Sequence, residues 1–442
     1  RRCIERDASA HPWQFVLQCR PRANATRLKT LSQSDAQAES VTERPTDLSL
    51  LATIAIGKLS VLLLVFLAYN LLPFFQANFE INFVDPLHPG VTLASAFSTW
   101  DAQHYLYLSE NGYHAGQVSD AFFPLFPLLI HLATPLFHNS LIAGLAVSNV
   151  ASLIGLYVLF KLVAELYGRA TARSTLLLYL AFPTAFFFSL IYTESLFLLL
   201  VATFFYLLFT RRLAWAALPA ALLPLARPEG VLIMLPFALY YAVEVLGLGR
   251  RAAERPLNSL VAADGFPAAL LARVRVVELA PVFSPLLGAA AYLLFMRAAT
   301  GNAFEMFQAM KSYVSAHSIT YVLHPLQLAH ALAEWPLAIH GFTNSAIDRA
   351  LFLVFLLLLV PMFRRVHPAL AVFALAVGIL NVASGTFMSY SRYLLLAFPI
   401  FIAAAMLLQR PNLRVLRLPL AYCMVMVQGL FLVMHALSYW VA

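Results

Sequence analysis

A cluster of polar residues at 97–114, FSTWDAQHYLYLSENGYH, interrupts an otherwise apolar chain. Asp101 follows Trp100 and begins a predicted helix, on which His104 and Tyr105 lie one turn further along, so that the three side chains share one face. A carboxylate that is partly withdrawn from water can accept the proton of an attacking sugar hydroxyl, as a general base does. The stretch therefore predicts a catalytic role for Asp101.

Two other interpretations of this stretch stay open. Ser98 lies three residues before Asp101, which is the spacing of a helix capping box, and an acid in the first turn of a helix is favoured by the helix dipole. The local pattern favours this capping interpretation, and a capping acid can also be catalytic. A metal site formed by Asp101 and His104 is the weaker alternative, because no second carboxylate lies at the usual ligand spacing. No metal ligand and no cofactor are predicted, and a divalent metal ion is left as an alternative.

Three further charged residues stand near the ends of apolar runs. Arg227 in ARPEG and Arg392 in SRY are candidates for binding a phosphate or pyrophosphate, because a guanidinium offers two parallel donors to phosphate oxygens. Each is equally well explained as an interfacial arginine whose charge reaches water. Glu194 in YTESLF is a candidate for binding a sugar or acceptor hydroxyl, with a solvated interfacial glutamate as the alternative.

The composition predicts that membrane-spanning helices carry these residues. Of the 442 residues, 61% are hydrophobic and 11% are charged, and the mean hydropathy is +0.78. Soluble domains carry about 25% charged residues, and the continuous apolar runs have the length of about 17 to 25 residues that a helix needs to cross a bilayer. A transmembrane barrel would show short alternating segments instead. The predicted fold class is an all-α polytopic membrane protein.

About eleven transmembrane helices are predicted. They cover residues 51–72, 141–163, 174–191, 194–210, 213–226, 229–246, 276–297, 347–363, 367–386, 393–409 and 417–440. Residues 51–442 thus form one membrane domain, with a large first external loop at 73–140 and a second external segment at 298–346. Residues 1–50 form a polar tail that is expected to be disordered and, because it is rich in arginine, cytoplasmic.

The basic residues are interpreted as an orientation signal. The net charge of +8 does not indicate a nucleic-acid partner, because basic residues of membrane proteins gather in cytoplasmic loops. The arginine-rich loops all fall on the cytoplasmic side if the apolar segment 121–137 does not cross, and its prolines favour a broken or re-entrant helix. Glu194, Arg227, Glu229 and Arg392 then share the external face with Asp101. The three cysteines show neither a disulfide pattern nor zinc spacing.

A polar pocket on one face is typical of an active site rather than of a pathway through the membrane. The alternative is a transporter or flippase for lipids or lipid-linked sugars. Such a protein would need polar groups that line a path from both faces, and many have two repeated halves. No internal repeat is visible in this sequence.

Five motifs, in this order and spacing, resemble the PIG-V family of mannosyltransferases. They are WDAQHYLYLSENGY, AFFPLFP, FPTAFFFSLIYTESLF, ARPEG and SRYLLLAFP, and the resemblance extends over roughly residues 55–440. It implies a GT-C-type bundle that transfers a hexose, usually mannose, from a polyprenyl-phosphate or dolichyl-phosphate sugar on the exoplasmic face. It also implies that the base is Asp101 and that the substrate-binding residues lie in the matched motifs. These are His104, Tyr105, Tyr192, Glu194, Arg227, Arg392 and Tyr393.

The resemblance leaves the acceptor undefined, beyond a lipid or a glycan. Many relatives carry an acid near the positions of Ala115 and Gly116, whereas the nearest acid in this sequence is Asp120. The arginine-rich, lysine-poor composition indicates a bacterium, whose plasma membrane is the predicted location, with the endoplasmic reticulum membrane as the location if the source is eukaryotic. The expected partners are the donor lipid, the acceptor and the membrane.

Overall fold

The computed structural model describes residues 47–82, 90–245, 279–311, 324–333 and 337–441. These residues form helices and irregular connections, and no strand is found among them. Most of the expected tail at 1–50 lies outside the described residues. The prediction of an all-helical membrane protein is confirmed.

Each predicted span overlaps a helical segment, although the bounds differ. These segments are α3 (Asp47–Leu71), α8 (Ser140–Tyr167), α9 (Arg169–Ala181), α10 (Glu194–Phe209), α11 (Leu213–Ala226), η3 with α12 and η4 (Pro228–Val245), α16 (Ala280–Thr300), α19 (Ala346–Arg365), α20 (Pro368–Ala383), α22 (Pro399–Leu408) and α23 (Arg417–Ala436). Among the described residues, six helices are long and apolar enough to cross a membrane, and others are shorter apolar helices of 10–17 residues. The number of actual crossings stays a prediction.

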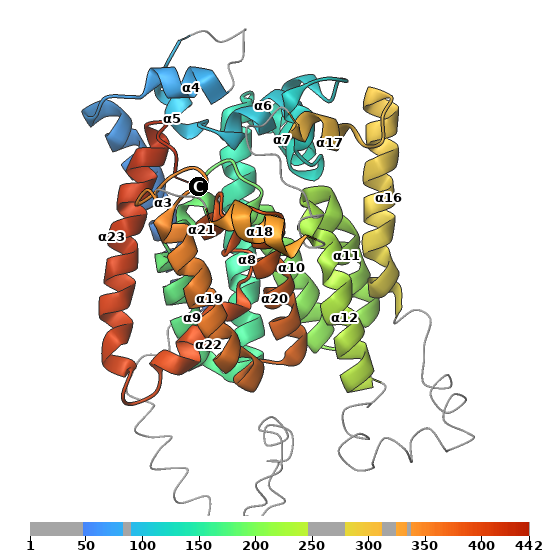
Figure 1. Ribbon diagram of the computed structural model, residues 1–442, viewed down its shortest axis with the longest axis vertical. Helices are drawn as coiled ribbons and strands as arrows, with labels where there is room; N and C mark the ends of the chain where they lie inside the picture. Colours follow the sequence, from blue (N-terminus) through green and yellow to red (C-terminus); the bar gives the residue numbers. More distant parts are fainter. Residues whose placement is uncertain (1–46, 83–89, 246–278, 312–323, 334–336, 442) are drawn as a thin grey trace, which may run out of the picture.

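The remaining short helices gather mainly at one end of the bundle (Figure 1). They include α4 (Gln76–Asn82), α5 (Leu93–Phe97), α6 (Asp101–Asn111), η1 (Val118–Ala121), α7 (Leu125–Phe137) and α17 (Glu305–Met310). The 13 residues of α7 rise about 20 Å, which is less than the hydrocarbon thickness of about 30 Å. α7 lies beside α6 at that end of the bundle, and the re-entrant course of segment 121–137 stays a prediction.

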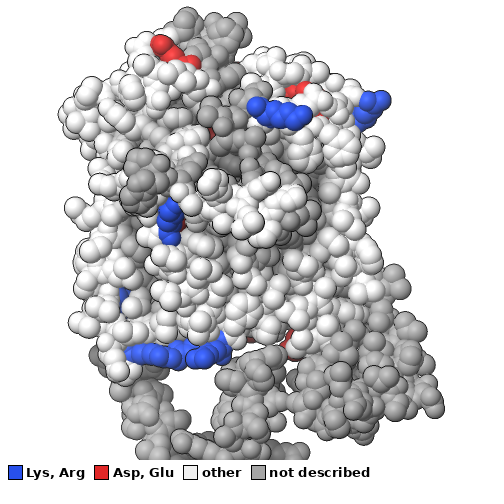
Figure 2. Space-filling model, in the orientation of Figure 1, with Lys and Arg blue, Asp and Glu red and all other residues white. Residues whose placement is uncertain are grey.

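Charged residues mark the opposite end. Figure 2 shows a band of Lys and Arg at the lower left of the molecule, and further single Lys and Arg side chains at mid-height and near the upper end, on a surface that is otherwise mainly uncharged. Arg211 follows α10, Arg364 and Arg365 close α19, and Arg410 follows α22. We refer to the part of the bundle that carries these four arginines as the basic end.

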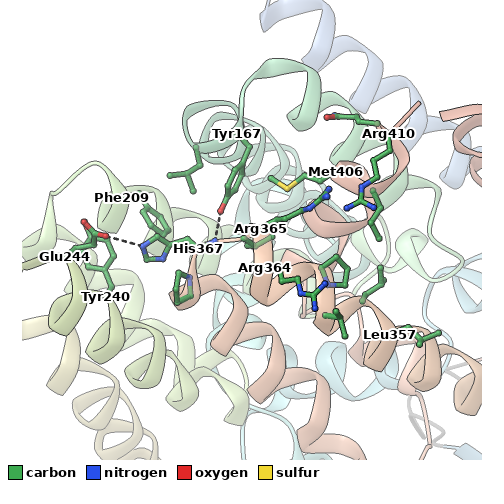
Figure 3. Close-up of a pocket in the computed structure, with 18 of the residues that line it drawn as sticks. Tyr167, Phe209, Tyr240, Glu244, Leu357, Arg364, Arg365, His367, Met406 and Arg410 are labelled. Carbon is green, nitrogen blue, oxygen red and sulfur yellow. Dashed lines mark hydrogen bonds and ion pairs between the residues drawn. The ribbon is translucent and has the colours of Figure 1, made fainter. Parts of the chain in front are cut away.

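A cavity of about 1450 Å³ opens at the basic end (Figure 3). The ends of α8, α10, α12 (Met234–Tyr240), α19 and α22 surround it. The residues of the five motifs named above as catalytic or substrate-binding do not line it.

Two of the expected spans are interrupted inside the bundle. The predicted span at 174–191 is helical only to Ala181, because Pro183 disfavours helical backbone in the residue before it, and an irregular stretch with η2 (Ala185–Phe188) continues to α10. The predicted span at 393–409 becomes an α-helix only at Pro399. Its first residues form a tight turn with bonds such as Leu396 N–H to the Tyr393 carbonyl.

Side chains from neighbouring helices satisfy the carbonyls that these interruptions expose. Lys58 of α3 donates to the carbonyl of Phe188 at 2.8 Å. The Gln428 amide of α23 donates to the carbonyls of Leu180 and Phe182 at 2.9 and 2.7 Å. In hydrocarbon, where water is absent, irregular backbone is tolerated only when the protein supplies such partners.

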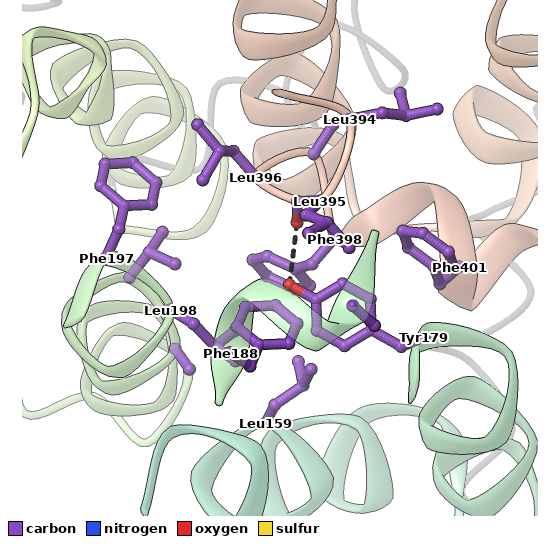
Figure 4. Close-up of a cluster of buried hydrophobic side chains, with 14 of the residues drawn as sticks. Leu159, Tyr179, Phe188, Phe197, Leu198, Leu394, Leu395, Leu396, Phe398 and Phe401 are labelled. Carbon is purple, nitrogen blue, oxygen red and sulfur yellow. Dashed lines mark hydrogen bonds between the residues drawn. The ribbon is translucent and has the colours of Figure 1, made fainter. Parts of the chain in front are cut away.

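The two irregular stretches pack against each other in the hydrophobic core. In Figure 4 the rings of Tyr179, Phe188 and Phe401 meet there, and the Tyr179 hydroxyl donates to the carbonyl of Leu395 at 2.8 Å. A Cβ on Gly155 of α8 would lie 2.9 Å from a backbone nitrogen of α10, so only glycine allows these helices to pack so closely. This rigid core supports the polar residues that follow each stretch.

Candidate active site

Five charged side chains from four distant parts of the chain form one network. Arg392 donates from Nη1 to Asp101 Oδ2 at 2.6 Å and from Nε to Glu194 Oε1 at 2.6 Å. Arg227 donates from Nη1 to the same Glu194 oxygen at 2.9 Å and from Nε to Glu229 Oε2 at 3.3 Å. The structure thus brings together four residues that the sequence predicted as site residues and Glu229, which the sequence placed on the same face.

Burial differs sharply within the network. The Glu194 side chain is 0% exposed and both arginine side chains are 9% exposed, whereas the Asp101 side chain is 30% exposed. Among the described residues, Asp101 Oδ1 has no hydrogen-bond partner. The geometry therefore leaves one carboxylate oxygen of Asp101 open to a substrate, while pairing compensates the buried charges.

The local backbone sets the position of Asp101. Trp100 precedes α6 with φ of 55°, and no side chain caps the helix. The capping-box interpretation is therefore wrong, because the Ser98 hydroxyl donates to the carbonyl of Ala94 instead. The Trp100 indole packs edge-on against Trp440 with ring centroids 4.9 Å apart. Contacts of this kind hold a left-handed residue that would otherwise be strained.

Glu194 is the first residue of α10, so its carboxylate lies at the positive end of the helix dipole. Its neighbour Thr193 accepts a hydrogen bond from Arg227 at 3.0 Å. The interpretation of Glu194 as a solvated interfacial residue is wrong, since the side chain is completely buried. Its second oxygen, Oε2, is also buried and has no hydrogen-bond partner in the described part of the chain.

The ARPEG motif folds η3 (Pro228–Ile233) tightly back on α11. A Cβ added to Gly230 would lie 2.3 Å from the carbonyl carbon of Leu223, so this close approach requires glycine. Arg227 ends α11 in an extended conformation with φ of −158°, and Glu229 follows two residues later. The turn therefore places an acidic and a basic side chain next to each other.

The SRY motif is held by a residue that sequence analysis missed. The backbone N–H of Ser391 donates to Asp348 Oδ1 at 2.7 Å, and Asp348 is 1% exposed in the first turn of α19. The Arg392 guanidinium lies over the rings of Tyr192 and Phe187, 4.5 and 5.0 Å from their centroids. Such cation–π contacts fix the plane of the guanidinium. An aspartate inside an apolar run was the available signal for Asp348.

The tyrosines singled out by the resemblance surround the network. The Tyr192 hydroxyl donates to the carbonyl of Thr99 at 3.0 Å, and the Tyr105 hydroxyl lies 3.4 Å from the Thr193 hydroxyl. The Tyr393 ring lies under Arg227 at 5.1 Å. His435 of α23, which sequence analysis also missed, contacts the Tyr192 hydroxyl at 3.2 Å.

His104 packs into the first external loop. Its Nδ1 lies 2.9 Å from the Ser119 hydroxyl, and its ring stacks on Phe122 with centroids 4.7 Å apart. Burial lowers the pKa of His104 to about 4, a shift that the nearby Asp101 carboxylate only partly opposes. The imidazole is therefore neutral at pH 7.

The acid that follows the GY motif is Asp120. It lies in η1, fully buried, and neither carboxylate oxygen has a hydrogen-bond partner among the described residues. Burial raises the pKa of Asp120 to about 6, and the charge of Glu305 adds to this shift. Glu305 itself accepts from the backbone N–H of Gly116 at 2.8 Å. In the described ranges, no three His, Cys, Asp or Glu side chains are grouped so as to hold a metal ion.

A comparison with family models finds the same family that the sequence motifs resemble. Residues 73–235 match the family model described as mannosyltransferase (PIG-V), a segment that contains Asp101, Glu194 and Arg227. No curated protein matches the chain.

Solved structures of the oligosaccharyltransferase AglB from Archaeoglobus fulgidus are similar. One, tethered to an acceptor peptide, has 14% identity and a TM-score of 0.42, with 86% of this chain and 55% of that chain covered. Another, in complex with an inhibitory peptide and a dolichol-phosphate, has 14% identity and the same TM-score, with 86% and 56% covered. The chain thus spans about half the length of these structures. The family match over residues 73–235 agrees with the resemblance of the motifs to the PIG-V mannosyltransferases.

Proposed function

We propose that the protein transfers a hexose from a polyprenyl-phosphate donor to a lipid or glycan acceptor at the end of the bundle that carries Asp101. The observation that carries the proposal is the partly exposed Asp101 carboxylate, held 2.6 Å from a buried guanidinium. Mannose is the sugar that the family match suggests. A base beside a phosphate-binding cation is the pair of groups that such a transfer needs.

The proposed reaction is a single displacement with inversion. Asp101 Oδ1 accepts the proton of the acceptor hydroxyl, and the hydroxyl oxygen attacks the anomeric carbon of the sugar. The bond from that carbon to the phosphate oxygen breaks, and the lipid phosphate leaves as an anion. Arg392 stabilises this anion through Nη2, which has no protein partner among the described residues.

Glu194 and Arg227 position the reacting groups in this proposal. Glu194 binds both guanidinium groups through one oxygen and so fixes their separation. The ring of Tyr192 lies against the guanidinium of Arg392, and the ring of Tyr393 lies against that of Arg227. We propose no cofactor and no metal-dependent step.

Replacement of the base tests the proposal most directly. Asp101→Asn keeps the size of the side chain but removes the proton acceptor, so transfer from radiolabelled polyprenyl-phosphate mannose to a membrane lipid extract should fall about 100-fold or more. Glu80→Gln, at an exposed acid of the same end, serves as the control and should transfer normally. Normal turnover by Asp101→Asn, or movement of intact donor lipid across liposomes without transfer, would contradict the proposal.

The phosphate-binding role of Arg392 has its own test. Arg392→Lys retains the charge but loses the donors arranged along one plane. The KM for the donor lipid should rise several-fold more than the KM for the acceptor, because the departing phosphate belongs to the donor. An unchanged dependence on donor concentration would show that Arg392 does not bind the phosphate.

A further inference from the structure

The cavity at the basic end is distant from the Asp101 network. Glu194 and Phe209 are the two ends of α10, which is 16 residues long, and about 24 Å separates them at 1.5 Å per residue. Glu194 belongs to the network and Phe209 lines the cavity. The cavity is therefore a separate site that the proposed transfer does not use.

Arginine side chains gather around this cavity without matching acids. Figure 3 shows Arg364, Arg365 and Arg410 around it. In the described part of the chain, these three guanidinium groups make no hydrogen bond or ion pair. The acid that lines the cavity, Glu244, lies 3.8 Å from Arg211 and 3.7 Å from His367. The cavity thus has a surplus of positive charge that a ligand can neutralise.

One hydroxyl group adds a directed donor. Tyr167 OH accepts a hydrogen bond from the backbone N–H of His367 at 2.8 Å, as the dashed line in Figure 3 shows. Its own proton remains available for donation to a ligand oxygen.

One wall of the cavity is apolar and continues onto the lipid-facing side of the bundle. Val354, Leu357 and Pro361 lie at helical spacing along α19 and line the cavity. Leu357 is 73% exposed on a helix long and apolar enough to cross a membrane. A hydrocarbon chain in the surrounding bilayer can therefore lie along this wall without leaving its apolar environment.

We propose that this cavity binds an anionic phospholipid of the leaflet at the basic end. Its phosphate lies among Arg364, Arg365 and Arg410, and one acyl chain lies along α19. Basic pockets between transmembrane helices bind anionic lipid head groups, and each arginine near the surface strengthens the attraction. A zwitterionic phosphatidylcholine offers no net charge to these arginines and binds more weakly than phosphatidylglycerol.

Native mass spectrometry of the purified full-length chain, titrated with phosphatidylglycerol or phosphatidylcholine, tests the proposal. Wild-type protein should retain phosphatidylglycerol in preference to phosphatidylcholine. The triple variant Arg364→Ala, Arg365→Ala, Arg410→Ala should bind phosphatidylglycerol at least about tenfold more weakly. The control removes the same charge from exposed arginines of this region that do not line the cavity, with Arg173→Ala, Arg212→Ala and Arg414→Ala. Equal losses in both triple variants would overturn the proposal.

A second pair of variants distinguishes a lipid from a free phosphate. Leu357→Trp fills the apolar side of the cavity without a change of charge and should weaken phosphatidylglycerol binding. Leu353→Trp, at a 60% exposed position of α19 outside the cavity, should not. Glycerol phosphate, which has no acyl chains, should compete poorly. Equal competition by glycerol phosphate together with no effect of Leu357→Trp would show an anion site and overturn the lipid assignment. A melting curve for each variant confirms folding.

Discussion

At the scale of single residues, the site depends on the Glu194 carboxylate, which binds two guanidinium groups. Glu194 Oε1 accepts from Arg227 and from Arg392 at 2.9 and 2.6 Å, in a position that water does not reach. Removal of one member of a buried pair leaves an uncompensated charge, which costs far more than the pair itself contributes. Glu194 is therefore as important for the fold of this region as for chemistry.

Replacement of Glu194 should reveal this dependence. Glu194→Gln keeps the shape but leaves each arginine with a single acidic partner, so the free energy of unfolding should fall by about 3–5 kcal/mol. Denaturant unfolding in mixed micelles measures the change. Glu165→Gln, at an exposed position of α8, is the control. If both variants unfold at the same denaturant concentration, the buried network does not stabilise the fold.

The charged residues of the network could be predicted from the sequence, whereas residues that hold them in place, such as Asp348, were not. Asp101, Glu194, Arg227 and Arg392 stood out because charge is rare in apolar runs. Their mutual distances depend on tertiary packing, for which no local pattern exists. Glu229 lies two residues after Arg227, yet only the turn at η3 makes it a partner. His104 was grouped with Asp101 by helical spacing, whereas its ring contacts Ser119 and Phe122.

At the scale of elements, broken helices place the polar residues at the site. The irregular stretch before α10 ends at Glu194, and the turn before α22 begins just after Arg392. Pro183 and Pro399 identify these breaks in the sequence, and the predicted spans nevertheless ran through them because the residues are apolar. Hydropathy does not distinguish a helix from an apolar turn whose carbonyls are satisfied by side chains such as Lys58.

The contact between α6 and η1 should respond to pH through two opposing groups. The raised pKa of Asp120, about 6, means that its charged form destabilises the fold, and this cost is relieved as the pH falls from about 6 to 4. The lowered pKa of His104, about 4, means that stability is lost as the pH falls from about 6.5 to 4.

Two variants separate these contributions. Asp120→Asn leaves only the histidine effect, so its melting temperature should drop more than that of the wild type between pH 7 and pH 5. His104→Gln leaves only the carboxyl effect, so acidification should lower its melting temperature less than that of the wild type. Melting curves in detergent at the two pH values measure both changes. Parallel shifts in all three proteins would contradict the assignment of these groups.

At the scale of the whole molecule, the two ends of the bundle differ in charge and in chemistry. The Asp101 network lies at one end and the unmatched arginines at the other. The sequence predicted this division, since every span expected from hydropathy overlaps a helical segment and the arginines follow the ends of these segments. It did not predict the cavity, because the elements around it come from distant parts of the chain.

The orientation of the bundle can be measured by labelling of single cysteines. In a chain with Cys3, Cys19 and Cys423 replaced by serine, Asn111→Cys should react with an impermeant maleimide only from the external side, and Arg212→Cys only from the cytoplasmic side, because basic residues are retained in the cytoplasm. Right-side-out and inverted vesicles give the two readings. The reverse pattern would place the Asp101 network in the cytoplasm.

The ion pair between Asp101 and Arg392 has a consequence for wasteful hydrolysis. In the proposed reaction the donor phosphate is an anion, and it competes with the Asp101 carboxylate for the N–H groups of the Arg392 guanidinium. Donor binding would therefore separate Asp101 from Arg392 and free both carboxylate oxygens of Asp101 for the acceptor hydroxyl. Without a bound donor, Arg392 Nη1 stays on Asp101 Oδ2, and one carboxylate oxygen is occupied when water enters the site.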